Sequence, residues 1–133
     1  MIIADNNLVV YLFVEGPHSE ETRAVLKQEE AWMVPPLWRS EFLNAMLGYI
    51  RQDALTEAGA VRYFEEAEAI VQMIEPPRID TVLHLAVQHR LSAYDATYAA
   101  LARHLGVQHV TYDGQVLRAG LGIHPRDFLS QAM

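Results

Sequence analysis

Four acidic residues lie where a predicted strand ends or a predicted helix begins, positions from which their side chains could form one site. Asp5 follows the apolar run "MIIA", and Asp113 follows "VQHVT". Glu41 lies in the first turns of one predicted helix and Asp95 in the first turn of another. Each acid also has a local explanation as a helix cap, a favourable charge at a helix N-terminus or a turn residue. Grouped carboxylates are instead typical ligands of Mg²⁺ or Mn²⁺.

The spacing of apolar residues predicts short strands separated by helices. Thr56 and Ser92 stand at N-cap positions, Ser92 and Asp95 match a capping box, and Gly106 stands where a helix would end. We predict strands at 1–4, 31–34 and 107–111, helices at 6–13, 19–29, 37–52, 57–74, 79–91 and 93–105, a turn with a short helix at 113–120, and a last strand or sheet edge at 122–129.

This order of elements predicts an α/β fold. Short strands connected by helical crossovers favour a parallel sheet inside an α/β/α sandwich. In such a sheet the strand C-termini and the following helix N-termini meet at one edge, where ligands bind. Asp5, Asp95 and Asp113 are expected at that edge, and Glu41 joins them if its helix starts there. Four carboxylates at one edge repel one another unless a cation lies between them.

Composition narrows the class of protein. The chain has 133 residues, 51% of them hydrophobic, which fits one domain spanning 1–133. It has no cysteine, which excludes thiolate zinc sites and fits a cytoplasmic protein. No apolar run approaches the roughly 20 residues of a membrane span, and no basic segment precedes the first apolar run. With a net charge of −7, the chain needs local cations to bind a polyanion.

Two groups of residues are assigned to structure. The histidine pairs 84/89 and 104/109 are each five residues apart, which is poor spacing for a metal site on a helix. Tyr94, Tyr98, Leu101 and Leu105 share one helix face, for which we favour core packing over a dimer face.

Four segments together resemble a known family. "IADNNLVVYLF", "VPPLWRSEFLNAM", "LSAYDATYAALARHLG" and "HVTYDGQVLRAG" look like the successive motifs of PIN-domain ribonucleases, most nearly the VapC toxins of toxin–antitoxin pairs. The likeness covers most of the chain, and its most specific part is "LSAYDATYAALA" followed by "TYD". Asn6 departs from the pattern, since the family usually has Thr, Ser or Ala after its first acid.

The resemblance implies a metal-dependent endoribonuclease that uses Mg²⁺ or Mn²⁺. It also implies a homodimer, a structured RNA substrate such as tRNA, and an antitoxin peptide that blocks the site. Water is the expected nucleophile, which would leave a 5′-phosphate and a 3′-hydroxyl. The family pattern assigns catalysis and metal binding to Asp5, Glu41, Asp95 and Asp113, with polar support from Asn7, Asn44 and Thr111.

The sequence leaves undecided what two arginines contact, and it leaves two competing functions to consider. Arg39 and Arg118 lie near the acids in sequence and could contact RNA phosphate or pair with a carboxylate. One competing function is a catalytically silent PIN-like binding module, which would not need four acids. The other is a phospho- or acyl-aspartate enzyme with Asp5 as nucleophile, but a second acid would be expected where the chain has Asn7. The endoribonuclease is therefore the leading hypothesis.

Overall fold

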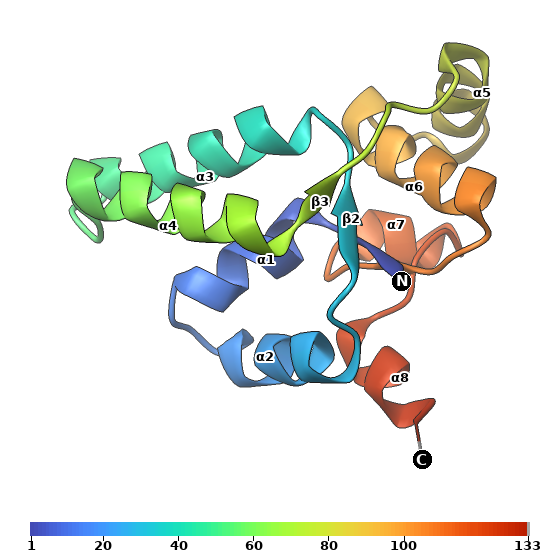
Figure 1. Cartoon of the computed structure of the whole chain (residues 1–133). Helices are drawn as coiled ribbons and strands as arrows, with labels where there is room; N and C mark the ends of the chain where they lie inside the picture. The colour runs from blue at the N-terminus through green and yellow to red at the C-terminus, as the bar shows by residue number, and fades with distance from the viewer. Residues whose placement is uncertain (133) are drawn as a thin grey trace.

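A four-stranded parallel sheet runs through the middle of the protein (Figure 1). The computed structural model describes residues 1–132. The strand order is β3-β2-β1-β4, and the first strand, which is buried throughout, lies between the second and the fourth. The parallel α/β fold predicted from the sequence is confirmed. The strands are β1 (Ile2–Ala4), β2 (Trp32–Val34), β3 (Gln72–Met73) and β4 (His109–Val110).

Helices connect the strands and cover the sheet (Figure 1). Both predicted N-caps are present, since the Thr56 hydroxyl accepts from Gly59 N and the Ser92 hydroxyl from Asp95 N, each at 3.0 Å. Gly106 ends its helix with a φ of +67°, as its position predicted. The helices are α1 (Asn6–Phe13), α2 (Ser19–Gln28), α3 (Trp38–Arg51), α4 (Glu57–Ile70), α5 (Ile79–His89), α6 (Ala93–Leu105), α7 (Gly114–Arg118) and α8 (Pro125–Ser130).

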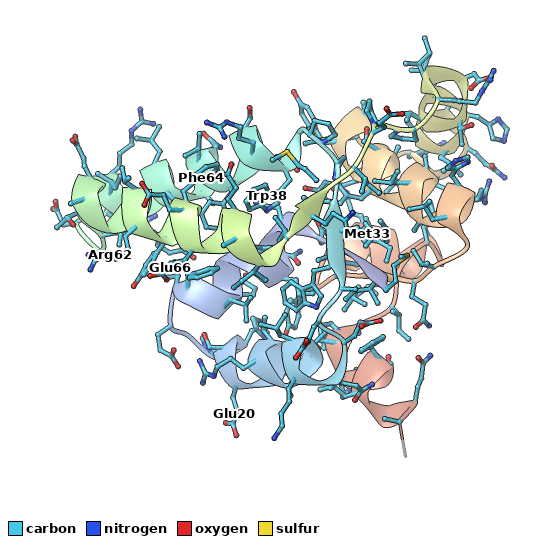
Figure 2. The ribbon with its side chains drawn as sticks, viewed as in Figure 1. Glu20, Met33, Trp38, Arg62, Phe64 and Glu66 are labelled. Carbon is cyan, nitrogen blue, oxygen red and sulfur yellow. The ribbon has the colours of Figure 1, made fainter. Side chains whose placement is uncertain are left out.

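An aromatic cluster fixes α3 against α4. The rings of Trp38 and Phe64 are stacked with centroids 5.7 Å apart, and Phe42 lies 5.3 Å from Trp38. Figure 2 shows Trp38 and Phe64 between the two helices. Because α3 carries Glu41 in its first turn, this packing fixes the position of that acid relative to the sheet.

The sequence prediction missed β3. The helix predicted over 57–74 ends at Ile70, because Val71 is extended with φ −87° and ψ 152°. Gln72 and Met73 then pair with β2, and Ile74 N donates to Val34 O at 2.9 Å. Such pairing joins distant parts of the chain, so local helical spacing cannot reveal it.

The prediction of a last strand or edge at 122–129 is wrong except at one residue. Ile123 forms an isolated parallel bridge with Val110, and its N–H donates to His109 O at 2.8 Å. Helix α8 then begins at Pro125, a residue favoured at the first helical position. Its cap is His124, whose Nδ1 accepts from Arg126 N at 3.0 Å.

Within residues 1–132, every helix is too short or too polar to cross a bilayer.

Candidate active site

Asp5 lies at the junction of β1 and α1, and both of its carboxylate oxygens have partners. Oδ1 accepts from Asn6 N at 2.8 Å, so Asp5 does cap the helix. Oδ2 accepts from the Thr111 hydroxyl and lies 3.6 Å from His109 Nε2. Burial raises the pKa of Asp5, but His109 and these hydrogen bonds outweigh it and hold the pKa below its ordinary value. Asp5 is therefore charged at neutral pH.

Thr111 connects the first acid to the fourth. Besides donating to Asp5, its oxygen accepts from Asp113 N at 3.0 Å and lies 3.4 Å from Asn7 Nδ2. Asn7 Oδ1 in turn accepts from Tyr112 N at 3.3 Å. The Asp113 carboxylate caps α7 by accepting from Val116 N at 2.9 Å. Two of the three polar residues predicted to support the site, Asn7 and Thr111, thus hold the segment after β4 against the start of α1.

Glu41 and Asp95 complete the group of acids. The Tyr98 hydroxyl donates to Glu41 Oε1 at 2.7 Å. Burial raises the pKa of Glu41 to about 7, aided by the charges of Asp5 and Asp95 and opposed by the Tyr98 hydrogen bond. Burial also raises the pKa of Asp95, with the charges of Asp113 and Asp5 adding to it. These effects place the four acids in one electrostatic cluster, while their catalytic roles stay predictions.

The acids suit a hard divalent cation by chemistry. Every donor is a carboxylate oxygen, and the charges of Asp5 and Asp95 add to the burial that raises the pKa of Glu41. Within residues 1–132, however, no three acidic or histidine side chains are close enough together to hold one ion as they stand. Metal binding would therefore need side-chain movement that draws the carboxylates together.

The three remaining predicted residues have different surroundings. Asn44 is exposed one turn after Glu41 on α3. Arg39 turns toward α4, where its Nη1 lies 3.1 Å from Glu68 Oε2. It therefore takes the second alternative that the sequence left open, pairing with a carboxylate. Arg118 is exposed on α7. Its guanidinium lies over Gly114, the residue after Asp113, so closely that a Cβ added to Gly114 would be 2.9 Å from Nη1.

Sequence reasoning missed the roles of Tyr98 and His109. The packing interpretation is right for Tyr98, which is buried, and wrong for Tyr94 and Leu105, which are exposed; the Tyr98 hydroxyl also donates to Glu41. Its place three residues after Asp95, on the same helix face, was the available signal. His109 is 2% exposed and stacks on the Tyr98 ring with centroids 5.6 Å apart. No local pattern marks it, because β4 and α6 bring it to Asp5 and Tyr98 through tertiary packing.

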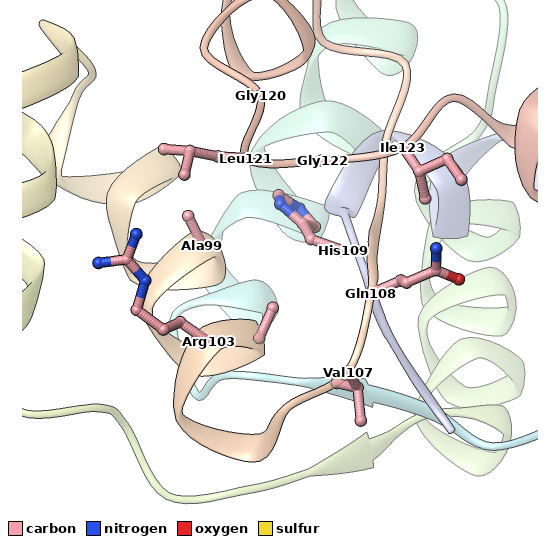
Figure 3. Close-up of a pocket in the computed structure, with 10 residues that line it drawn as sticks. Ala99, Arg103, Val107, Gln108, His109, Gly120, Leu121, Gly122 and Ile123 are labelled. Atoms are coloured by element: carbon pink, nitrogen blue, oxygen red, sulfur yellow. The ribbon is translucent and has the colours of Figure 1, made fainter.

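The chain segment after α7 covers His109. Figure 3 shows the His109 side chain beside Gly122 and near Ala99 of α6. These residues line a cavity of about 360 Å³. Gly122 is needed for this close approach, because a Cβ there would lie 2.8 Å from Thr111 Cγ2 and 3.1 Å from His109 O. The segment therefore helps to fix Thr111, and through Thr111 it fixes Asp5.

Comparison with known proteins agrees with this geometry. The PIN-domain family model matches residues 2–120, and the chain belongs to the PIN-domain family. "Exonuclease VapC9" of Pyrobaculum aerophilum is 32% identical over 92 residues, or 69% of each chain. "Ribonuclease VapC3" of the same organism is 26% identical over 119 residues, which is 86% of this chain and 91% of that protein. The resemblance to PIN-domain and VapC proteins is confirmed.

Solved structures share the fold over nearly the whole chain. The crystal structure of PAE2754 from Pyrobaculum aerophilum superposes with a TM-score of 0.79 at 25% identity, covering 98% of this chain and 87% of that one. A toxin–antitoxin complex from Klebsiella pneumoniae gives 0.70 at 15% identity, covering 94% of this chain and 98% of that one. At that identity the second match supports the fold alone.

Proposed function

We propose that this protein is a VapC-type toxin, a cytoplasmic metal-dependent endoribonuclease that hydrolyses RNA phosphodiester bonds. The observation that carries the proposal is the cluster of Asp5, Glu41, Asp95 and Asp113 on the predicted ligand-binding side of a PIN-domain sheet. The ribonuclease and exonuclease names of its relatives support nuclease chemistry.

The chain's own residues have distinct tasks in this mechanism. A divalent cation, when bound, supplies a water of lowered pKa and neutralises phosphate charge. Asp5 is kept ionised and oriented by Thr111 and His109, so its carboxylate would be charged when the acids draw together around a cation. Tyr98 orients Glu41 through Oε1, which leaves Oε2 to bind the cation or to accept a proton from the attacking water. In the metal-free site burial raises the pKa of Glu41 to about 7, a range in which a carboxylate can exchange a proton near neutral pH.

A circular RNA tests whether the cleavage is internal, because it has no end for an exonuclease. We expect the purified protein with Mg²⁺ or Mn²⁺ to open a circular single-stranded RNA into linear products with a 5′-phosphate and a 3′-hydroxyl. Asp95→Asn should abolish the reaction, and Glu65→Gln, which neutralises an exposed acid on α4, should not.

Each other result has a definite meaning. Digestion of the linear RNA but not of the circle would make the protein an exonuclease. Cleavage that persists in EDTA, or products with a 2′,3′-cyclic phosphate, would refute the metal-dependent mechanism. Binding without cleavage of either RNA would favour the catalytically silent PIN-like module.

The partners belong to the same proposal. An antitoxin with a basic segment would complement both the net charge of −7 and the acid cluster. We also propose a homodimer. Co-expression with the product of the neighbouring reading frame, followed by purification and mass measurement by light scattering, should yield a complex of two toxin chains with that product. Recovery of a free monomer while the second protein is demonstrably expressed would contradict both assignments.

A further inference from the structure

A cavity of about 530 Å³ opens directly beside Glu41, between the N-terminal turns of α3 and α6. One wall consists of an aromatic ring, that of Tyr94, and the other consists of α3. Small-ligand sites have volumes of roughly 300–1,000 Å³, so the cavity is large enough for one nucleotide unit. Its lining residues are Leu37, Ser40, Glu41, Asn44 and Tyr94.

We propose that this cavity is a nucleobase subsite, in which a base beside the scissile phosphate stacks on Tyr94. This inference rests on the proposed function and adds the residues that would hold an unpaired base beside the scissile phosphate. A base in a duplex is already stacked on its neighbours, so only an unpaired base could reach the Tyr94 ring.

The exposure of Tyr94 is the first observation that supports the subsite. Tyr94 and Tyr98 share one face of α6, yet Tyr98 is 1% exposed and Tyr94 is 64% exposed. Packing therefore explains Tyr98 but not Tyr94. The ring of Tyr94 is also well placed, because its backbone lies in the first helical turn between the Ser92 cap and Asp95. A base stacked there would hold the adjoining phosphate close to Asp95.

The charge of the lining residues is the second observation. They include one carboxylate and no cation, so a phosphate would be repelled, whereas an uncharged base would not. Ser40 and Asn44 are four residues apart on α3 and line the same wall, where a hydroxyl and an amide can bond to the edge of a base. Arg39, the cation nearest in sequence, is held by Glu68 and by the Phe64 ring 4.8 Å away.

The test combines a protein substitution with a substrate lesion. Tyr94→Ala should lower kcat/KM for a short single-stranded RNA by roughly 5- to 100-fold, the range of one base–aromatic stack. Tyr94→Phe, which keeps the ring, should recover most of that loss. Leu83→Ala is the matched control, because it removes an exposed apolar side chain on α5. An RNA with an abasic nucleotide at the stacking position should be cleaved by the wild type as slowly as intact RNA is cleaved by Tyr94→Ala. On that abasic RNA, Tyr94→Ala should be no slower than the wild type.

A spectroscopic measurement reports stacking without catalysis. With 2-aminopurine at that position, binding to Asp113→Asn in Mn²⁺ should quench the fluorescence, and adding Tyr94→Ala should remove the quenching. The subsite is refuted if Tyr94→Ala cleaves as well as Leu83→Ala, or if its loss persists on abasic RNA. It is also refuted if Tyr94→Ala weakens only antitoxin binding, which would assign the cavity to a partner peptide. Failure of the wild type to cut any RNA would instead refute the proposed function.

Discussion

Replacing Glu41 by Gln should stabilise the metal-free protein at alkaline pH and have little effect at acidic pH. The pKa of Glu41 is raised to about 7 by burial and by the charges of Asp5 and Asp95. The folded state therefore holds a proton on Glu41 more tightly than the unfolded state does. The free energy of unfolding of the wild type must fall as pH rises from about 4.5 to about 7, and then level off. Glutamine cannot ionise, so the variant lacks this fall.

The size of the effect follows from the pKa. A rise from 4.5 to about 7 corresponds to roughly 3 kcal/mol at 1.36 kcal/mol per tenfold change in proton affinity. Glu41 is only half-buried, and solvent screening reduces this to about 1–2 kcal/mol. For a chain of this length that amounts to a gain of about 3–8 °C in melting temperature. The Tyr98 hydrogen bond should survive, because the amide oxygen of Gln can accept it.

The assay is urea unfolding in EDTA at a series of pH values between 5 and 8. Glu41→Gln should exceed the wild type by about 1–2 kcal/mol at pH 8 and by only about a quarter of that at pH 5. Glu65→Gln, an exposed acid on α4, should follow the wild type throughout. Mn²⁺ at pH 8 should stabilise the wild type more than Glu41→Gln, since the cation binds the folded state and relieves the same repulsion. Equal stability of Glu41→Gln and wild type at pH 8 would refute the raised pKa of Glu41 on which this prediction rests.

Three further predictions concern neighbours of Glu41. Asp95→Asn should abolish RNA cleavage with an unchanged circular dichroism spectrum, and retention of more than about a tenth of the activity, a barrier change below ~1.4 kcal/mol, would remove Asp95 from the site. Tyr98→Phe removes a hydrogen bond that lowers the pKa of Glu41, so the pH–rate profile should shift to higher pH, whereas a purely structural Tyr98 would change the melting temperature alone. Asp5→Asn should lower the free energy of unfolding in EDTA by about 1–2 kcal/mol above pH 5, because the folded state favours the charged form of Asp5. The difference should shrink as pH falls below 3.8. An Asp5→Asn variant that melts at a higher temperature than the wild type in EDTA would contradict this prediction.

Local signals were enough to predict most of the fold. The apolar runs of β1 and β2 and the caps Thr56 and Ser92 are properties of short segments, so the sequence predicts them directly. Strand β3 has no such signal, since its two residues are exposed and are defined only by pairing with β2. Its absence from the prediction did not affect the site, because β3 is an edge strand on the far side of β2 from the acids at β1 and β4.

The acids were predictable as a group because parallel topology brings strand ends and helix starts to one edge. The contacts that tune them were not predictable. Arg39 binds Glu68 because α3 packs on α4, and His109 reaches Asp5 because β4 pairs with β1. These contacts depend on which residues lie near a side chain in the folded structure, and residue spacing in the sequence does not reveal that. For Asp5 the structure shows the cap, since one carboxylate oxygen accepts from Asn6 N while the other faces Thr111 and His109, and its role as a metal ligand stays a prediction.

The charge distribution links the activity proposed for this protein to its inhibition. RNA is a polyanion, the chain carries a net charge of −7, and Arg39 is occupied away from the acids. A cation that neutralises the carboxylates would therefore help phosphate to approach the cluster, where burial first and then the charges of Asp5 and Asp95 raise the pKa of Glu41. A divalent ion would provide that neutralisation and leave the site open to RNA. A basic side chain of an antitoxin would provide the same neutralisation while filling the space. Metal and antitoxin should then compete for the four acids, so raising Mn²⁺ should weaken antitoxin binding to the wild type more than to Glu41→Gln.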